Sequence, residues 1–586
     1  MRKSNIFRVL AAALVLTLAL TGCSLTDIFN KGGGSRYQVE PTPDNRRTIS
    51  YDDMEYVRPD AEAIKARVEE LAALAANAKD FDELLTYDDE VSALMEEFYS
   101  MSTLAELRSY HDRTDTYYEE ENRYCEEVGV TLSNAVNDFN RVIVEGAYAD
   151  KYREEVGDYV FESIENALTL NSKEVEALKQ ERNALNIDYN SDLTNLTLQY
   201  EGSEYTMEDI ENFYYEENDI QKYYTYLMLY YKVNAEKFTE YYKRMVEIDK
   251  EVASILGFAS AADMYYLRYS RDYTPADAEK FFDYTKELFV PLIPSTNSYS
   301  MQTGSTVTLE DAKAAMPDAL KTINPELAEA WQFMMDNNLY DYEALPDKQS
   351  GIAFATTIDM YDAPFNYVYW EDNMYSTTSM MHEFGHYYDF WLHYDDSIVF
   401  NLDVAEIYSQ GLELLMQENF SDFTNDAEYY QAAHLADFIN PLTYQPLLEE
   451  FQMRVFEMDE FDVDSISELY ADLQIEYGYG DYALIDENGR DYTWFRVTHI
   501  FDSPFYTISY WTSAVAALEI WAIGEEKWED GVDKYLELIH ADQNKPFREL
   551  LASVDLPDPT KKETLENIAD LFDKQLSSAG SGSRAA

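Results

Sequence analysis

The sequence predicts a mostly α-helical protein that contains a small β-sheet. Apolar residues recur three and four positions apart through 61–78, 172–185 and 208–256, which is the spacing of an amphipathic helix. Two short segments, 350–357 and 364–370, break this period and combine β-branched or aromatic residues with Gly and Pro. Hydrophobic residues make up 46% of the 586 residues, enough for more than one core.

The charge balance excludes one class of partner. The chain has 44 basic and 113 acidic residues, which gives a net charge of −69. Phosphate backbones repel a surface of this sign, so nucleic-acid binding is not expected. With two cysteines, the chain has neither a disulfide framework nor a cysteine-rich metal site. We expect Cys125 to be a small buried apolar side chain.

The first residues predict export and lipid attachment. A basic start at 1–8 precedes an apolar run at 9–20 that is too short to span a bilayer permanently. The run ends in Leu-Thr-Gly-Cys at 20–23, which resembles the lipobox of bacterial lipoproteins. We therefore predict a signal peptide at 1–22, a lipidated Cys23, and a bacterial lipoprotein that is anchored to a membrane outside the cytoplasm.

Composition predicts the remaining organisation of the chain. Residues 23–50 contain a Gly-rich stretch and then Pro-Thr-Pro, which is typical of a flexible tether. Small and polar residues at 577–586 predict a disordered tail. Between these segments we predict an N-terminal helical lobe at 51–255 and a second domain at 256–576, which carries the motifs that follow.

The strongest chemical signal is a His-Glu-x-x-His sequence on a predicted helix. Ser and Thr residues at 376–379 offer N-caps for this helix, which then carries His382, Glu383 and His386. Two histidines four residues apart lie on one helix face, so both imidazoles can reach a single Zn²⁺. The glutamate can act as the general base on water. The motif predicts a zinc hydrolase, and the alternative is a solvated histidine pair on a helix surface.

A catalytic zinc site needs a third protein ligand. His393 shares the face of the histidine pair, but it lies about 10 Å further along the helix axis, too far to share the ion. Residues 403–413 predict a second helix, and Glu406 follows the first histidine by 24 residues, enough for an antiparallel return. Glu406 is therefore the candidate ligand, and we expect Glu413 to be solvated or to hydrogen-bond a ligand. Three further histidines have no motif context and are expected to be structural: His111, His434 and His540.

Several blocks resemble the zinc oligopeptidases of the thimet oligopeptidase and oligoendopeptidase F family. His-Glu-Phe-Gly-His at 382–386 is identical to a common family form, and Glu406 begins a block similar to the family's Glu-x-x-Ser-Gln. Residues 350–354 resemble the edge strand that precedes the active helix, and 499–510 resemble a C-terminal block of His and Tyr. With a weaker match at 256–275, the resemblance covers roughly the C-terminal half of the chain.

The resemblance implies a two-lobed helical fold with a deep substrate channel and a small sheet beside the zinc-binding helix. It implies one zinc ion per chain, held by the two motif histidines and Glu406, in a metalloendopeptidase that cuts short peptides. Glu383 would activate water and pass the proton to the leaving amine. The strand near Gly351 and Ala353 would pair with the substrate backbone.

The C-terminal block would stabilise negative charge on the carbonyl oxygen of the substrate. By resemblance, Tyr510 is the first choice for the hydroxyl donor and Tyr506 the second, and His499 would hold the substrate or the oxyanion. Related chains carry glycines between these residues, whereas this chain has Pro504, which stiffens the segment. The alignment of the two tyrosines can therefore shift by a position.

Several hypotheses of function stay open at this level. The first is a monomeric zinc endopeptidase that acts on short peptides outside the cytoplasm. An exo-acting dipeptidyl carboxypeptidase would need a positive group for the substrate C-terminus, which the sequence does not locate. A non-catalytic peptide-binding lipoprotein would share the lipobox and the tether without needing both the motif helix and Glu406. An inactive protein with the same fold would not need its metal ligands.

Overall fold

The computed structural model describes residues 46–394, 399 and 401–582. The predicted signal peptide, Cys23 and the tether up to residue 45 lie outside these residues. Within the described part of the chain, no helix has both the length and the apolar composition that a membrane span requires. The chain divides into two compact units, and each is built from segments that are far apart in the sequence.

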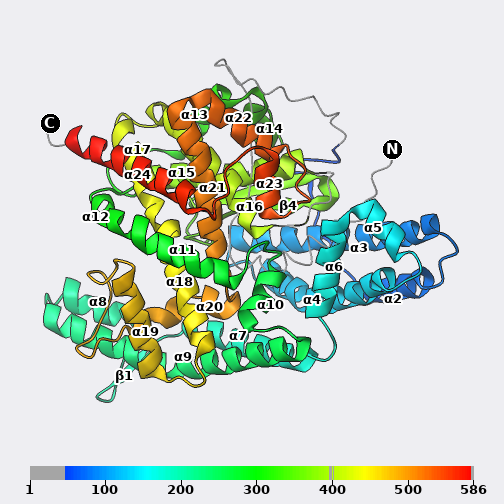
Figure 1. Ribbon diagram of the computed structural model, residues 1–586, viewed down its shortest axis with the longest axis horizontal. Helices are drawn as coiled ribbons and strands as arrows, with labels where there is room; N and C mark the ends of the chain where they lie inside the picture. The colour runs from blue at the N-terminus through cyan, green and yellow to red at the C-terminus, as the bar shows by residue number, and fades with distance from the viewer. Residues whose placement is uncertain (1–45, 395–398, 400, 583–586) are drawn as a thin grey trace. The chain divides into compact units, whose positions relative to one another are not determined.

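Unit 1 comprises the described residues up to Leu168, then Ser295–Phe438, then the described residues from Thr512 onward. It contains helices and a small sheet (Figure 1). Its elements in chain order are η1 (Tyr51–Asp53), α2 (Ala61–Ala75), α3 (Phe81–His111), α4 (Thr116–Val144), α5 (Ala149–Val156), α13 (Leu309–Ile323), α14 (Pro325–Asp336), β3 (Tyr340–Asp341), β4 (Ala353–Ile358), η3 (Asp359–Tyr361), β5 (Ala363–Val368), α15 (Met374–Leu392), α16 (Leu402–Met416), η4 (Gln417–Asp422), α17 (Ala427–Asp437), α22 (Trp528–Ile539), α23 (Phe547–Ser553) and α24 (Lys562–Gly582).

Unit 2 comprises Thr169–Pro294 and Ile439–Trp511. Its elements are α7 (Glu176–Leu193), β1 (Leu198–Tyr200), β2 (Ser203–Tyr205), α8 (Met207–Tyr215), α9 (Ile220–Leu256), α10 (Ala261–Arg268), α11 (Pro275–Leu288), η2 (Val290–Leu292), α18 (Ile439–Glu457), α19 (Val463–Glu476), η5 (Tyr492–Arg496) and α20 (His499–Asp502). The helices that cross a boundary between the units are α6 (Asp158–Leu170), α12 (Ile293–Thr296) and α21 (Ile508–Glu526). The predicted boundary at 255/256 falls inside unit 2, where α9 ends.

The N-terminal helices of unit 1 pack as one layered group. Helices α2, α3 and α4 contact one another (Figure 1), and with α5 and α6 they share a single hydrophobic core. Asp60, Asp80 and Asp115 cap the first three helices, because each carboxylate accepts a hydrogen bond from a backbone N–H group of the first turn. Cys125 on α4 is fully buried, as predicted.

The structure corrects the helix predicted at 208–256. This segment forms two helices, α8 and α9, although the apolar spacing continues across the break. Thr206 and Asp209 form a capping box at the start of α8, and Asp219 caps α9. Asn218 adopts a φ of 54° between the helices, a left-handed conformation that Asn tolerates better than most residues. The capping residues therefore decide the break, which periodicity alone does not indicate.

Two other boundaries differ from those predicted. The helix expected at 172–185 is α7, which begins at Glu176 and runs on to Leu193. The final helix, α24, continues to Gly582 and thus enters the segment that composition predicted as a disordered tail. Both differences arise because composition does not set the exact end of a helix.

The small sheet predicted from 350–357 and 364–370 lies in unit 1. Strands β4 and β5 pair antiparallel, with Ala353 opposite Val368, and the short strand β3 pairs parallel with β5. Asp362, with a φ of 47°, completes the turn between β4 and β5. The strand order is β3-β5-β4, so among the described strands β4 pairs on one side only. Helix α15 packs against both β4 and β5, which places the sheet beside the motif helix.

The last residues of the predicted tether, 46–50, are bound to unit 1. Arg47 donates from Nε and Nη2 to the Asp362 carboxylate at 3.0 and 2.6 Å, and from Nη1 to Glu96 at 2.6 Å. Arg46 lies 4.0 Å from the ring centroid of Trp391 and donates to the Trp391 carbonyl oxygen at 2.6 Å. Trp391 is in the last turn of α15, so Arg46 places a positive charge at the negative end of that helix dipole. Composition had predicted flexibility here.

Replacing Arg47 by Ala should lower the free energy of unfolding of the protein. The Asp362 and Glu96 side chains are 5% and 6% exposed, and each would lose a charged hydrogen-bond partner, at a cost of about 1–3 kcal/mol. Denaturant unfolding measures the difference. Lys65→Ala is the control, because Lys65 pairs with a 57% exposed Glu69 and should change stability by less than about 0.5 kcal/mol. Equal effects of the two substitutions would contradict the account of Arg47.

Candidate metal centre and active site

Helix α15 begins one turn earlier than the predicted caps indicate. Asn373 is the N-cap, and its side chain accepts a hydrogen bond from the Ser376 N–H at 2.8 Å. The Ser and Thr residues at 376–379 lie inside the helix instead. Thr377 donates to the carbonyl of Asn373 at 3.0 Å, and Ser379 to that of Tyr375 at 2.9 Å. Hydroxyl groups of this kind bond either at a cap or to a carbonyl four residues back, so they do not locate a helix start by themselves.

The two motif histidines stand one turn apart on α15, and a glycine between them lets α16 approach. The ring centroids of His382 and His386 are 5.0 Å apart, with the ring planes at 84°. A Cβ atom on Gly385 would lie 2.5 Å from the Cα of Ser409 and 2.6 Å from the carbonyl oxygen of Tyr408. Only glycine allows the two backbones to come this close. The contact sets the position of α16, and with it the position of the predicted third ligand.

Replacing Gly385 by Ala should destabilise the protein and weaken metal binding. In an open helix this change stabilises by about 0.5–1 kcal/mol, but here the new methyl group would overlap backbone atoms that cannot move separately, at a cost of about 1–3 kcal/mol or more. Gly524→Ala on α21 is the control, because its Cβ would meet no atom closer than 3.9 Å. Unfolding and metal titration of both variants provide the measurement. Equal behaviour of the two would show that the close approach is unimportant.

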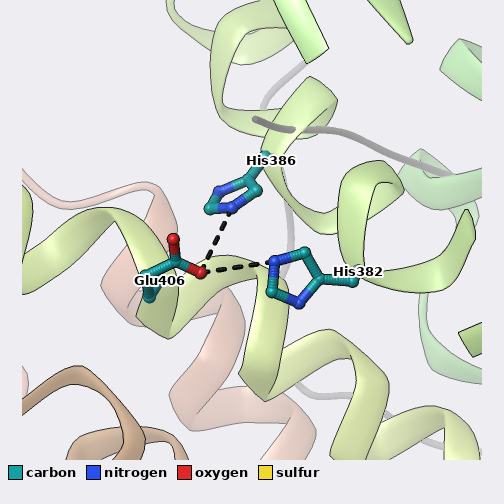
Figure 2. Close-up of side chains that lie close together, drawn as sticks. All are labelled: His382, His386 and Glu406. Carbon is teal, nitrogen blue, oxygen red and sulfur yellow. Dashed lines mark ion pairs between the residues drawn. The ribbon is translucent and has the colours of Figure 1, made fainter. Parts of the chain in front are cut away.

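Glu406 from α16 faces both histidines. Its Oε2 atom lies 3.3 Å from His382 Nε2 and 3.4 Å from His386 Nε2 (Figure 2). Three ligand atoms that each bind zinc at about 2.0–2.1 Å in a tetrahedral arrangement lie about 3.3 Å from one another. Among the described residues, these three form the group whose ligand atoms converge as a metal site requires. The spacing therefore fits a tetrahedral metal ion better than it fits ordinary hydrogen bonds.

Burial and charge give these residues the protonation states that a metal needs. Burial lowers the pKa of His386, which favours the neutral imidazole. Burial also raises the pKa of Glu406, but the electrostatic attraction of the two histidines outweighs this and holds its pKa well below the usual value. In the described part of the chain, neither ring nitrogen of His386 has a hydrogen-bond partner, although the residue is only 1% exposed. A neutral imidazole, an ionised carboxylate and an unbonded buried nitrogen all fit a metal ligand set.

A second carboxylate orients His382. Glu413 accepts a hydrogen bond from His382 Nδ1 at 2.5 Å and another from His434 Nε2 at 2.8 Å. Gln417 donates from Nε2 to His434 Nδ1 at 2.8 Å, which assigns the Nε2–H tautomer to His434. With Nδ1 of His382 as the donor, the lone pair of its Nε2 is directed at the cluster. Glu413 thus hydrogen-bonds a ligand, one of the two roles expected for it.

Sequence reasoning missed two residues of this centre. His434 was expected to be structural, because no motif surrounds it, yet it holds Glu413. Ser409 donates to Glu406 Oε2 at 3.0 Å and so orients the third ligand. The resemblance to a Glu-x-x-Ser-Gln block was the available signal for Ser409, whereas His434 had none.

Replacing Glu413 by Gln should weaken metal binding without abolishing it. The amide cannot accept two charge-assisted hydrogen bonds, so His382 loses its fixed tautomer, and losses of this kind reduce metal affinity about 10–100-fold. Competition with a chelator measures the affinity. Glu418→Gln on η4 is the control, because that side chain is exposed and should leave the affinity unchanged. An unaltered affinity in the Glu413 variant would exclude the orienting role.

Glu383 and His393 complete the predicted residues on and beside α15. Glu383 directly follows His382 and is 3% exposed, so a carboxylate stands next to a candidate ligand within the protein interior. His393 follows the helix, and its Nε2 donates to the carbonyl oxygen of Ile539 at 2.9 Å. His393 is thus bonded outside the cluster, in agreement with its exclusion as a ligand.

The remaining histidines predicted to be structural pair with carboxylates. His111 Nδ1 lies 2.8 Å from Asp341 Oδ2, and this hydrogen bond raises the pKa of His111. His540 Nε2 lies 2.8 Å from Glu326 Oε2, which also accepts a hydrogen bond from Tyr388 at 2.8 Å. These contacts tie separate segments of unit 1 together.

The predicted C-terminal block lies in unit 2 and forms a group of its own. The ring centroid of His499 lies 5.6 Å from that of Tyr506 and 6.3 Å from that of Tyr510, and the two tyrosine rings are 5.3 Å apart. Burial lowers the pKa of His499, and its Nε2 has no hydrogen-bond partner among the described residues. The structure therefore gathers the predicted site residues into two groups, one inside each unit.

The residues predicted to bind the substrate backbone stand at the start of β4. Gly351 has a φ of 73°, in the left-handed region that favours glycine, and Ala353 is the first residue of the strand. The Tyr369 N–H donates to the Ile352 carbonyl at 3.1 Å, which closes the hairpin on its inner side. The outer side of β4 pairs with no other described strand.

Comparison with known protein families shows to which family the chain is related. Residues 51–171 match the Peptidase M3 N-terminal domain, and residues 316–569 match Peptidase family M3. The two matches together cover more than half of the chain. The chain belongs to peptidase family M3. The second match includes α15 and α16, so the histidine pair and Glu406 lie within the family region of this M3 chain.

Individual relatives agree with this assignment. The M3 chain is 24% identical to "Oligopeptidase PepF" of Bacillus subtilis (strain 168) over 574 residues, covering 86% of this chain and 81% of the relative. It is 29% identical to an "Oligoendopeptidase F homolog" of Borreliella burgdorferi over 223 residues, and that match spans only 36% of either protein.

Solved structures share the fold. PZ peptidase A with an inhibitor superposes with a TM-score of 0.76 at 23% identity, covering 90% of this chain and 99% of that one. Oligoendopeptidase-F from Enterococcus faecium gives a TM-score of 0.58 at 15% identity, covering 89% and 98%. The prediction of a mostly helical oligopeptidase fold is therefore confirmed. The deep channel that the resemblance implied stays a prediction.

Proposed function

We propose that this M3 chain is a zinc-dependent endopeptidase that hydrolyses short peptides outside the cytoplasm. The observation that carries the proposal is that Glu406 Oε2 lies 3.3 and 3.4 Å from the Nε2 atoms of His382 and His386, with the buried Glu383 adjoining the first histidine. Family membership supports peptide hydrolysis as the reaction class, and the relatives named oligopeptidase and oligoendopeptidase support a short substrate.

The residues of the cluster would divide the work of hydrolysis. When bound there, zinc supplies Lewis acidity, which polarises a carbonyl and lowers the pKa of water. Glu383 accepts the proton of the attacking water and then returns it to the leaving amine. Glu413 holds His382 in the tautomer that presents Nε2, and Ser409 holds Glu406. The contacts that Glu413 and Ser409 need for these tasks are already formed.

The group in unit 2 would act on the carbonyl oxygen. Tyr510 and Tyr506 carry neutral hydroxyl donors, and one such donor aimed at a developing oxyanion contributes about 3–4 kcal/mol to the transition state. We assign the oxyanion role to Tyr510 first and Tyr506 second. His499, whose pKa burial lowers, would hold the substrate as a neutral imidazole. The unpaired side of β4, which starts at Ala353 after Gly351, would pair with the substrate backbone.

The setting of the enzyme is part of the proposal. The Leu-Thr-Gly-Cys sequence supports lipidation at Cys23 after removal of residues 1–22, and hence a membrane-anchored enzyme outside the cytoplasm. The expected partners are short peptides and the membrane that holds the lipid, with no nucleic acid. We propose a monomer that holds one zinc ion.

A peptide mixture tests the proposal. The chain from residue 24 onward would be incubated with peptides of about five to thirty residues, with and without a zinc chelator, and the products would be read by mass spectrometry. We expect chelator-sensitive internal cuts that are confined to the shorter peptides.

Other products would favour the alternatives. Dipeptides released only from C-termini would replace the endopeptidase by a dipeptidyl carboxypeptidase. Zinc binding and peptide affinity without cleavage would leave a peptide-binding lipoprotein, and zinc binding with neither affinity nor cleavage would leave an inactive member of the family. A Glu383→Gln protein, purified in the same way and incubated with the same peptides, shows how much of the cleavage comes from a contaminating peptidase.

A further inference from the structure

The turn between His499 and Tyr510 contains a strained residue that its surroundings hold in place. Phe505 has a φ of 60°, in the left-handed region that non-glycine residues rarely occupy, and it is fully buried. Its N–H donates to Gln452 Oε1 on α18 at 2.9 Å. The ring packs against Phe456, with centroids 4.9 Å apart. A conformation of this kind persists only where neighbouring groups determine it, at a cost of about 1–3 kcal/mol.

A buried carboxylate on α18 holds the residue that directly follows Tyr506. Glu449, whose side chain is 0% exposed, accepts a hydrogen bond from Thr507 at 3.2 Å and another from Tyr266 at 2.9 Å. Thr507 lies directly after Tyr506. The carboxylate therefore ties the turn to α10, which carries Tyr266.

A buried guanidinium also contacts the residues around the two tyrosines. Arg271, also 0% exposed, lies 3.9 Å from Glu449 and donates from Nη2 to Ser509 Oγ at 2.8 Å. The same nitrogen lies 3.4 Å from the carbonyl oxygen of Tyr506. The guanidinium also stacks over aromatic rings, 4.5 Å from the centroid of Tyr266. Arg271 thus contacts one tyrosine of the group directly and the residue that precedes the other.

A buried ion pair is a costly way to fill a core. Apolar residues of the same volume commonly give equal or higher stability, so the pair needs another reason to be present. Here Arg271 and Glu449 both direct polar atoms at residues 506–509. These contacts leave the segment little freedom.

We propose that Arg271 and Glu449 are positioning residues that hold Tyr506 and Tyr510 beside His499 as a pre-formed donor group. The two tyrosines and His499 are then held in this arrangement before substrate arrives. The inference rests on the proposed function, because it assigns a task to residues that act through the two tyrosines. The proposal requires that substitutions at Arg271 or Thr507 lower kcat only in a protein that still has the hydroxyl groups of Tyr506 and Tyr510.

A double-mutant cycle tests this dependence. Arg271→Lys keeps the charge but loses the planar fork, and Thr507→Val removes one buried hydroxyl. Each would be combined with Tyr506→Phe/Tyr510→Phe, and kcat, KM and bound zinc would be measured. We expect Arg271→Lys to lower kcat at least tenfold, with KM and zinc content unchanged, and to add less than twofold in the background without the hydroxyls.

The matched control is Thr443→Val on the same helix as Glu449. Thr443 is fully buried, and its hydroxyl bonds to the Ile439 carbonyl at 2.6 Å and to Tyr479 at 2.7 Å, away from the turn. Thr443→Val removes two side-chain hydrogen bonds, against the one to Glu449 that Thr507→Val removes, and it should leave kcat unchanged. If the effects of Arg271→Lys and of the tyrosine changes multiply, or if the control lowers kcat equally, the pair is merely structural and the proposal is overturned.

Hydrogen exchange separates this proposal from the proposed function. Arg271→Lys should speed exchange of the amides from Phe505 to Tyr510 at least tenfold, and Thr443→Val should not. This result is independent of peptide cleavage. A wild-type protein that cleaves no peptide would overturn the proposed function, and unchanged exchange in Arg271→Lys would overturn the positioning role even in an active enzyme.

Discussion

Replacing Glu383 by Gln should lower kcat/KM about 10²–10⁴-fold while zinc content and thermal stability stay unchanged. Gln has the same shape as Glu but cannot accept a proton, so the step that activates water loses its base. Glu383 is 3% exposed, and an amide of the same shape opens no cavity at this buried position. The steady-state kinetics of purified wild-type and variant proteins on one short peptide give the ratio.

Bound zinc in the Glu383 variant is the control for this measurement. Glu383 is not one of the three residues whose ligand atoms converge on the metal position, so zinc should be retained in a one-to-one ratio. Activity within threefold of the wild type would refute the role of Glu383 as the base. Loss of zinc together with activity would instead show that the substitution disturbs the centre itself.

Replacing Glu406 by Gln should remove both zinc and activity. The carboxylate supplies one of three ligands and the only negative charge among them, and an amide oxygen is a far weaker ligand for zinc. The affinity should fall by more than the 10–100-fold expected for Glu413→Gln, which removes a residue that only orients a ligand. Without the metal, the barrier rises by several kcal/mol, so turnover should fall about a thousandfold or more.

The comparison of Glu406 with Glu413 is sharp because both residues lie on α16, seven positions apart. Metal content after dialysis and kcat/KM at saturating added zinc are measured for both variants. The Glu413 variant should regain most of its activity when zinc is added, and the Glu406 variant should not. Equal rescue of the two would contradict the assignment of Glu406 as the ligand.

The sequence predicts best what depends on local spacing. His382 and His386 share a helix face by their separation alone, and Glu383 follows from the same motif. Local spacing alone could not predict Glu406 as a ligand, because its position depends on where the second helix packs against the first. The close contact at Gly385 supplies the physical basis for that return, with backbone atoms that a Cβ would meet at 2.5 Å.

Contacts between distant segments could not be predicted. His434 reaches the centre through Glu413, and no pattern around it indicates this. Arg46 contacts Trp391, which lies 345 residues away in the sequence. Composition carries no information about so distant a contact, and it therefore assigned residue 46 to a flexible tether. The break between α8 and α9 was not predicted for a different reason. Asp219 starts a new helix there, while the apolar spacing continues across the break.

Zinc titration of the metal-free protein tests the central claim most directly. Peptide cleavage and bound zinc are measured at each addition in the chain from residue 24 onward. The account predicts no cleavage without metal and activity that rises in proportion to bound zinc until one ion per chain is bound. Full cleavage by the metal-free protein, or stoichiometric zinc binding with no cleavage of any short peptide, would contradict it.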